Sequence, residues 1–86
     1  MNVEKYEIPD GSLQQIEDWI RGSKARGSFN AGDLKDMIEE LAGRQGDPRL
    51  KRVAYRLADR LIQKFKKDGS IVRAEQQGTR PRWRWA

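Results

Sequence analysis

The stretch that decides the fold is DPRLKRVAYRLADRLIQKFKKDGSIVR, residues 47–73. Asp47 can cap a helix, and Pro48 loses no hydrogen bond at the first helical position, so a helix is expected to begin there. Apolar residues recur on one face at helical spacing and basic residues lie opposite. Lysines suit the negative end of a helix, and Gly69 can adopt the left-handed conformation that closes one. The segment therefore predicts an amphipathic helix over residues 48–67 with a basic back.

A first helix is predicted upstream, after a Pro-Asp-Gly turn. Ser12 and Gln15 form a capping box, in which each side chain satisfies a backbone N–H at the helix start. We therefore expect this helix to begin at about Leu13 and to close at Gly22. The next residues, 22–27, have the composition of a flexible, mildly basic connection.

A second helix is predicted after Ser28–Phe29, which is long enough only for a short edge strand. Asn30 is a good capping residue, and acidic side chains follow it in the first turns. An apolar stripe then continues for about three turns, and Gly43 is expected to end the helix.

The chain is expected to end in a β-hairpin whose turn is formed by residues 76–79, with Gly78 where positive φ is needed. Pro81 suits an edge strand. With Gln77 and Gly78 at the centre of the turn, the expected facing pairs are Val72 with Trp83, Arg73 with Arg82, and Glu75 with Arg80. A slip of one residue would invert the faces, because Ile71 and Val72 are both apolar.

Length and composition limit the classes of protein. A chain of 86 residues forms one domain with a modest core, which we place at residues 12–86, after an arm over residues 1–11. The absence of Cys and His excludes a thiolate nucleophile, a disulfide framework and the usual structural zinc ligands. No signal peptide or membrane span is evident, so a cytoplasmic protein is expected.

Charge is distributed unevenly along the chain. Residues 1–43 contain five Lys and Arg against nine Asp and Glu, whereas residues 44–86 contain thirteen against four. The net charge is therefore −4 in the first half and +9 in the second. A positive field confined to one part of a small domain attracts polyanions, and we expect the acidic half to face away from them.

Two groups of basic residues are candidates for nucleic-acid contact. Those of the long helix recur on one side of it, interrupted by Asp59. Those of the hairpin are expected to share one face, where like charges that face each other oppose folding. The candidate residues are Arg49, Arg52, Arg56, Arg60, Lys67, Arg73, Arg80, Arg82 and Arg84. Solvated basic surfaces are the alternative interpretation.

Aromatic residues interleave with these arginines, and their roles are open. Trp83 and Trp85 would stack single-stranded bases or seal a small core, and the second interpretation is favoured. Tyr55 would pack at the edge of the helix or donate its hydroxyl to a phosphate. The carboxylates at the start of the second helix are interpreted as caps or dipole partners, so no metal is expected. No apolar segment frames a pair of carboxylates and no glycine-rich phosphate loop is present, so no catalytic activity is expected. No cofactor or small-molecule ligand is expected either.

The order of helix, short strand, helix, basic helix and two-stranded ribbon resembles the winged helix-turn-helix family over about residues 12–86. The segments GSFNAGDLKDMIEELAG and LADRLIQKFKKDGSIVR carry the resemblance. It implies an α+β fold of three helices with a C-terminal β-hairpin wing. A helix of twenty residues is longer than the family's recognition helix, and a break near residues 48–51 would let a shorter helix begin nearer Arg52.

The resemblance implies binding of double-stranded DNA, with the third helix in the major groove and the wing on the backbone. The expected function is that of a small transcriptional regulator of bacterial, plasmid or phage type, which would bind alone or as a homodimer. One alternative is a protein-interaction module that docks on an acidic partner. A second alternative is a single-stranded nucleic-acid binder.

Overall fold

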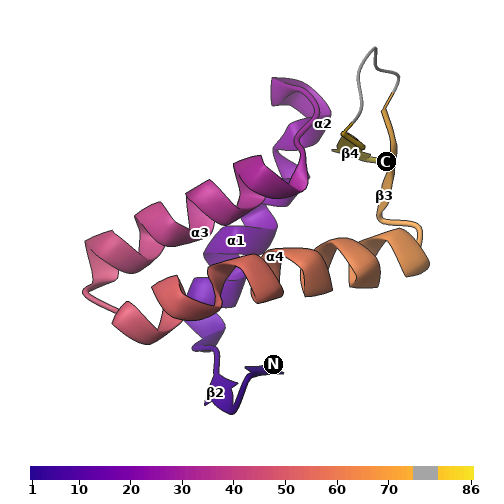
Figure 1. Cartoon of the computed structure of the whole chain (residues 1–86). Helices are drawn as coiled ribbons and strands as arrows, with labels where there is room; N and C mark the ends of the chain where they lie inside the picture. The colour runs from indigo at the N-terminus through magenta and orange to yellow at the C-terminus, as the bar shows by residue number, and fades with distance from the viewer. Residues whose placement is uncertain (75–79) are drawn as a thin grey trace.

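Three long helices and a C-terminal two-stranded sheet make up most of the computed structural model, which describes residues 1–74 and 80–86 (Figure 1). The elements in chain order are β1 (Asn2–Val3), β2 (Tyr6–Glu7), α1 (Asp10–Arg21), α2 (Ser23–Arg26), α3 (Ala31–Gln45), α4 (Pro48–Lys67), β3 (Ile71–Arg73) and β4 (Trp83–Trp85). The fold is α+β, as predicted, and its element order is compatible with a winged helix whose wing is the β3–β4 sheet.

The start of α1 differs from the prediction. The helix begins at Asp10, and no side chain caps it, so the predicted capping box at Ser12 is wrong. Ser12 is buried instead, and its hydroxyl donates a hydrogen bond of 2.8 Å to Oε1 of Gln45, near the end of α3. The hydroxyl thus links α1 to α3 and does not cap its own helix. The predicted close of the helix at Gly22 is confirmed.

The segment predicted to be a flexible connection forms one helical turn, α2. Ser23 fixes the first residue of α2 in place. The fully buried Ser23 hydroxyl donates to the carbonyl oxygen of Ile20 (2.6 Å) and accepts from the Trp85 amide (2.9 Å). A single bridge follows at Phe29, which pairs with Trp83 through two backbone hydrogen bonds. The short extended segment expected at Ser28–Phe29 is therefore present, but as a single bridge to the first residue of β4 rather than as a strand.

Helix α3 begins as predicted and ends later than predicted. Asn30 and Asp33 form a reciprocal capping box at its start. The helix continues through Gly43, and Gly46 ends it in the left-handed conformation at φ 63°. The amide of Asp47 then donates to the carbonyl of Ala42, which satisfies a carbonyl that the helix end would leave free. Gly43 was a plausible end in sequence, but the left-handed position falls three residues later.

Helix α4 is continuous over all twenty residues, without the break considered near its start. Asp47 caps it through Oδ1, which accepts from the Leu50 amide at 3.0 Å, and Pro48 is its first residue. Gly69 has the expected positive φ, 82°. Only two residues separate α3 from α4, so the two helices pack as neighbours (Figure 1).

The register of the C-terminal sheet is shifted by one residue from the prediction. Ile71 faces Trp85, Val72 faces Arg84 and Arg73 faces Trp83. This register buries Ile71 and turns Val72 outward, where it is 40% exposed. It is favoured because Ile71 and both tryptophans then share the side that faces the helices. The predicted pairing of Glu75 and the turn at residues 76–79 lie outside the described residues.

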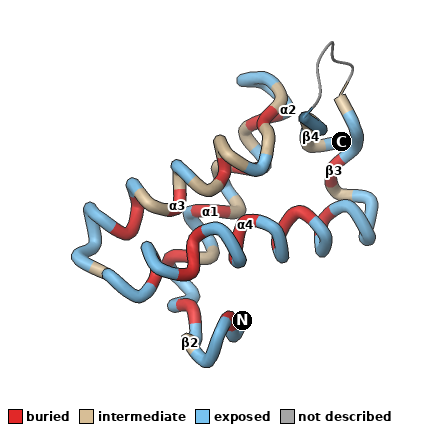
Figure 2. Tube along the Cα trace, viewed as in Figure 1, coloured by how far each residue is buried: buried red, intermediate tan, exposed pale blue. Residues whose placement is uncertain are grey.

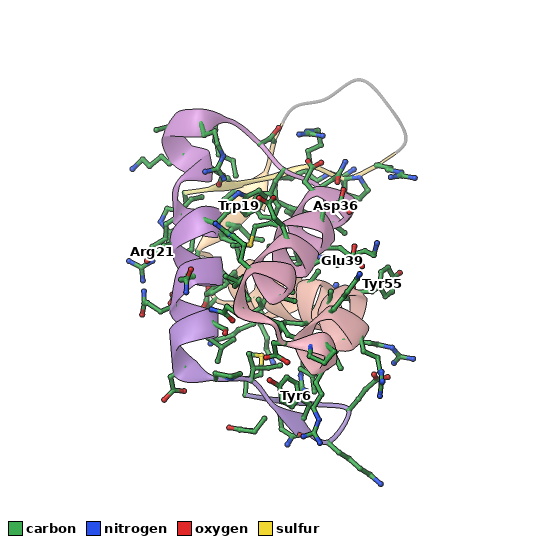
Figure 3. The ribbon with its side chains drawn as sticks, turned by 90° about the vertical axis from the view of Figure 1, so that its left-hand side faces the viewer. Tyr6, Trp19, Arg21, Asp36, Glu39 and Tyr55 are labelled. Carbon is green, nitrogen blue, oxygen red and sulfur yellow. The ribbon has the colours of Figure 1, made fainter. Side chains whose placement is uncertain are left out.

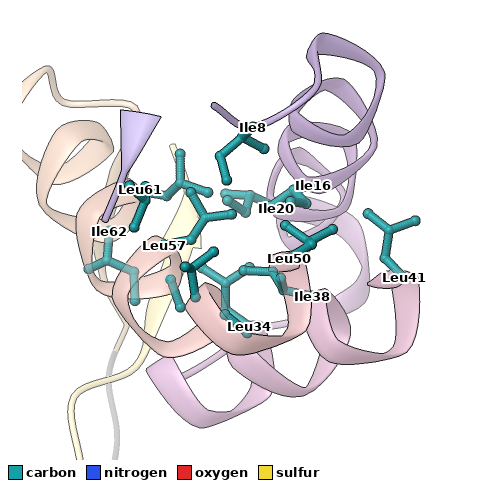
Figure 4. Close-up of a cluster of buried hydrophobic side chains, with 14 of the residues drawn as sticks. Ile8, Ile16, Ile20, Leu34, Ile38, Leu41, Leu50, Leu57, Leu61 and Ile62 are labelled. Atoms are coloured by element: carbon teal, nitrogen blue, oxygen red, sulfur yellow. The ribbon is translucent and has the colours of Figure 1, made fainter. Parts of the chain in front are cut away.

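The core is one cluster that draws on every helix except α2 (Figures 2 and 4). Its α4 side is a stripe of buried residues, and the N-terminal arm, which is a small β1–β2 hairpin, adds Val3 and Ile8. Trp83 and Trp85 are half-buried against this cluster, and the Trp85 ring meets Phe65 edge-on at 5.7 Å between centroids. The packing role favoured for these tryptophans is confirmed. No helix among residues 1–74 and 80–86 is long and apolar enough to cross a membrane.

Candidate nucleic-acid interface

The outer face of α4 is strongly basic. Buried and exposed residues alternate along α4 at helical spacing, so its polar face lies at the surface (Figure 2). Eight exposed Lys and Arg and one exposed Asp share this surface, and the basic residues are Arg49, Lys51, Arg52, Arg56, Arg60, Lys64, Lys66 and Lys67. Like charges at i and i+4 destabilise a helix, so this density of cations is not explained by helix stability.

The N-terminal hairpin contacts two arginines of the predicted stripe on α4. Arg60 donates a hydrogen bond to the backbone carbonyl of Asn2, and the Arg49 guanidinium lies 5.9 Å from the centre of the Tyr6 ring. These two arginines hold the hairpin against α4, and sequence reasoning did not predict that role because the partners are more than forty residues away.

Arg56 and Arg52 are the more available members of the stripe. Nε of Arg56 lies 3.6 Å from Oε1 of Glu4, but the Arg56 side chain is 70% exposed, and an exposed pair of this kind contributes little to stability. Arg52 is exposed and forms no ion pair with any residue of 1–74 or 80–86. Both side chains, which were predicted as groove contacts, are therefore exposed at the surface, and only Arg56 has an ion-pair partner in the described residues.

The start of α4 is fixed by a hydrogen bond from the hairpin. The Tyr6 hydroxyl donates to Oδ2 of Asp47, the residue whose other carboxylate oxygen caps α4. This bond lowers the pKa of Asp47 below its ordinary value of 3.8, assisted by the Leu50 and Arg49 amides, and raises the pKa of Tyr6. The hairpin therefore orients the first turn of the helix that carries the basic face.

Arg82 has a structural environment that the sequence did not reveal. Its Nε donates to Oγ of Ser28 at 2.8 Å, its Nη2 donates to the Ser28 carbonyl at 2.8 Å, and Nη2 lies 3.4 Å from Oδ2 of Asp33. The side chain is 35% exposed. Arg82 thus ties the segment before β4 to the start of α3, and its guanidinium is largely committed to that contact.

The remaining hairpin arginines do not form the single row expected. Because facing residues of an antiparallel pair point to the same side, Arg73 shares the side of Trp83, whereas Arg84 shares the side of Val72. The predicted common face is therefore wrong for Arg73. Arg73, Arg80 and Arg84 are all exposed, as is Lys67 at the end of α4. Lys66, which was not predicted, places its amine 5.5 Å from the centre of the Trp83 ring.

A pocket of about 410 Å³ lies where the start of α3, the middle of α4 and the approach to β4 meet. We call it the junction pocket. Tyr55, Asp59 and Gln63 line it from α4, and Arg80 and Trp83 line it from the C-terminal segment. Tyr55 points outward at this edge of the molecule (Figure 3). The sequence predicted its position at the edge of the apolar face and left open a packing role or a phosphate contact, but it did not predict the pocket.

Among the acidic residues of α3, Glu39 lies near Tyr55, on the side of the molecule that carries this pocket (Figure 3). Asp36 instead lines a separate pocket together with Trp19. Lys35 neutralises part of the charge of both carboxylates, because its amine lies 3.0 Å from Glu39 and 3.9 Å from Asp36. The hydrogen bond to Glu39 raises the pKa of Lys35. In the described part of the chain, no three His, Cys, Asp or Glu side chains are grouped as metal ligands would be.

Comparison of the chain with protein-family models, with curated proteins and with solved structures gave no match.

Proposed function

We propose that this protein binds double-stranded DNA through the outer face of α4 and the arginines of the C-terminal sheet. The observation that carries the proposal is the excess of eight exposed cations over one exposed carboxylate on a single helix. Phosphates at the surface of a duplex would offset the mutual repulsion of these side chains and release counterions on binding. The element order, which resembles that of winged helix regulators, is the reason for proposing a duplex and a role in transcription regulation.

We assign three roles to the candidate residues from their exposure and contacts. Arg52 and Arg56 are proposed to enter the groove or to contact its phosphates. The flanking backbone contacts are assigned to the exposed side chains Lys67, Arg73, Arg80 and Arg84. Arg60 and Arg82 are assigned to positioning because each donates a hydrogen bond to a distant backbone carbonyl, and Arg49 because it lies against the Tyr6 ring. The contact of Arg56 with Glu4 is an exposed ion pair, so Arg56 stays with the binding residues.

The test is fluorescence anisotropy with a random-sequence duplex at several salt concentrations. Six phosphate contacts give a log–log salt slope of about −5 on duplex DNA. The double variant Arg52→Ala/Arg56→Ala should bind at least tenfold more weakly, with a slope smaller in magnitude by about 2. Far-UV circular dichroism should be unchanged, because both side chains are exposed.

The matched control removes two cations elsewhere. Lys24 on α2 and Arg44 near the end of α3 are exposed, so Lys24→Ala/Arg44→Ala lowers the net charge equally. This control should retain the salt slope of the unmodified protein. A flat salt dependence of the unmodified protein would contradict the proposal, and equal losses in the two double variants would mean that net charge alone drives binding.

A further inference from the structure

We infer that the junction pocket accepts one unpaired nucleotide of a nucleic acid whose duplex part lies on α4. The inference rests on the proposed function and adds a second kind of contact to it. The volume of the junction pocket, about 410 Å³, falls within the range of small-molecule sites, about 300–1,000 Å³. The pocket borders the basic face directly, since the same helix supplies both.

An aromatic ring stands at the mouth of the pocket. Tyr55 is 66% exposed, which is the largest exposure of any large hydrophobic side chain in the described residues. Leaving such a ring in water gains nothing for folding, whereas a base stacked on it is stabilised substantially. Ile62, Pro81 and Trp83 add apolar surface to the lining of the pocket. Together these side chains suit the faces of a planar base.

A cation for the phosphate of that nucleotide is also in place. Arg80 is exposed on the rim, with Nη1 beside Gly32 at the start of α3, 3.7 Å from where a Cβ atom would stand. Lys35 lines the same pocket, but its amine is held by Glu39 at 3.0 Å. Arg80 is therefore the group that we assign to the phosphate.

Asp59 explains which base would fit best. It is the single acidic residue on the exposed face of α4, where a carboxylate repels phosphates, and it forms no ion pair within the described residues. In the junction pocket it has a different use, because a carboxylate accepts hydrogen bonds from an exocyclic amino group such as N4 of cytosine. Gln63 beside it offers an amide donor and acceptor. The pocket should therefore favour cytosine over thymine, which has no amino group.

The experiment compares three duplexes of equal length by anisotropy: one fully paired, one with a central bulged cytosine and one with a central bulged thymine. The protein should bind the thymine bulge about fivefold more tightly than the paired duplex, the low end of the range for stacking one base. The cytosine bulge should gain more, about tenfold or better, because its amino group also donates to Asp59. Tyr55→Ala should abolish both gains and leave binding to the paired duplex unchanged.

Two further variants make the result specific. Val72→Ala removes an exposed apolar side chain outside the pocket and should keep both gains. Asp59→Asn should keep a gain for bulges but lose the preference for cytosine. The inference is overturned if salt-dependent binding is the same for all three duplexes, or if Tyr55→Ala weakens the paired duplex as much as the bulged ones; the proposed DNA binding would survive both results. No binding to any duplex would overturn both.

Discussion

Arg82 and Arg84 lie two residues apart, and the structure predicts opposite consequences for their removal. Arg82 makes two hydrogen bonds of 2.8 Å to Ser28 and lies 3.4 Å from a carboxylate oxygen of Asp33, whereas Arg84 is exposed. A hydrogen bond from a charged donor contributes about 1.5–3 kcal/mol when buried. Because the Arg82 side chain is 35% exposed, we discount the sum of its contacts to about 1–2 kcal/mol for Arg82→Ala.

For a domain of this size, about 1–2 kcal/mol corresponds to a fall in Tm of roughly 4–16 °C. Arg84→Ala should change Tm by no more than a few degrees and should weaken duplex binding through the loss of one phosphate contact. Thermal unfolding followed by circular dichroism and anisotropy at one salt concentration measure the two effects separately. Equal Tm values for the two variants would refute the structural role that we assign to Arg82.

Three further changes test other contacts. Ser23→Ala leaves the partly buried Trp85 amide of β4 without its acceptor and should cost about 1–3 kcal/mol of unfolding free energy in urea titrations, so an unchanged midpoint would contradict this role. Replacing Glu4 and Lys5, at φ 49° and 67°, with Asn-Gly should raise that midpoint by the equivalent of about 1–2 kcal/mol, because this turn favours Asn-Gly; a lower midpoint would count against it. Tyr6→Phe removes the main cause of the low pKa of Asp47. A carboxyl with a lowered folded pKa contributes stability above its unfolded pKa and loses it as pH falls, so the variant should unfold with a shallower pH dependence between about pH 5 and pH 2. An unaltered pH profile would exclude this linkage.

Helix ends were predictable where the signal lies within a few residues of the end. Asn30 and Asp47 cap α3 and α4 as predicted, since their side chains bond to amides three residues away. Ser12 failed because a partner from another helix, Gln45, competes for the hydroxyl. Gly43 failed because a glycine can continue a helix when a better left-handed site, here Gly46, follows it. The local sequence thus identifies the residues that can cap or end a helix, and tertiary contacts determine which of them do so.

Contacts between residues far apart in the sequence determine the register of the β3–β4 sheet and which arginines are structural. Ile71 and Val72 are equally apolar, and only packing against the helices decides which of them is buried. The candidate arginines look alike in sequence, yet Arg60 meets the N-terminal hairpin and Arg82 meets Ser28. Those partners lie more than fifty residues away, so no pattern along the helix or the strand could separate structural arginines from available ones.

The basic face also links the stability of the free protein to its proposed binding. Arg52, Arg56, Arg60 and Lys64 follow one another at i, i+4 spacing, which gives three repulsive pairs of about 0.2–0.5 kcal/mol each. The stripe of buried apolar residues on α4 outweighs this, since burying one Leu or Phe contributes about 1.5–3 kcal/mol. Salt screens the repulsion in the free helix, but it also weakens every phosphate contact. Added salt must therefore stabilise the free protein slightly while it dissociates the complex, and a surface that served only solubility would show the first effect without the second.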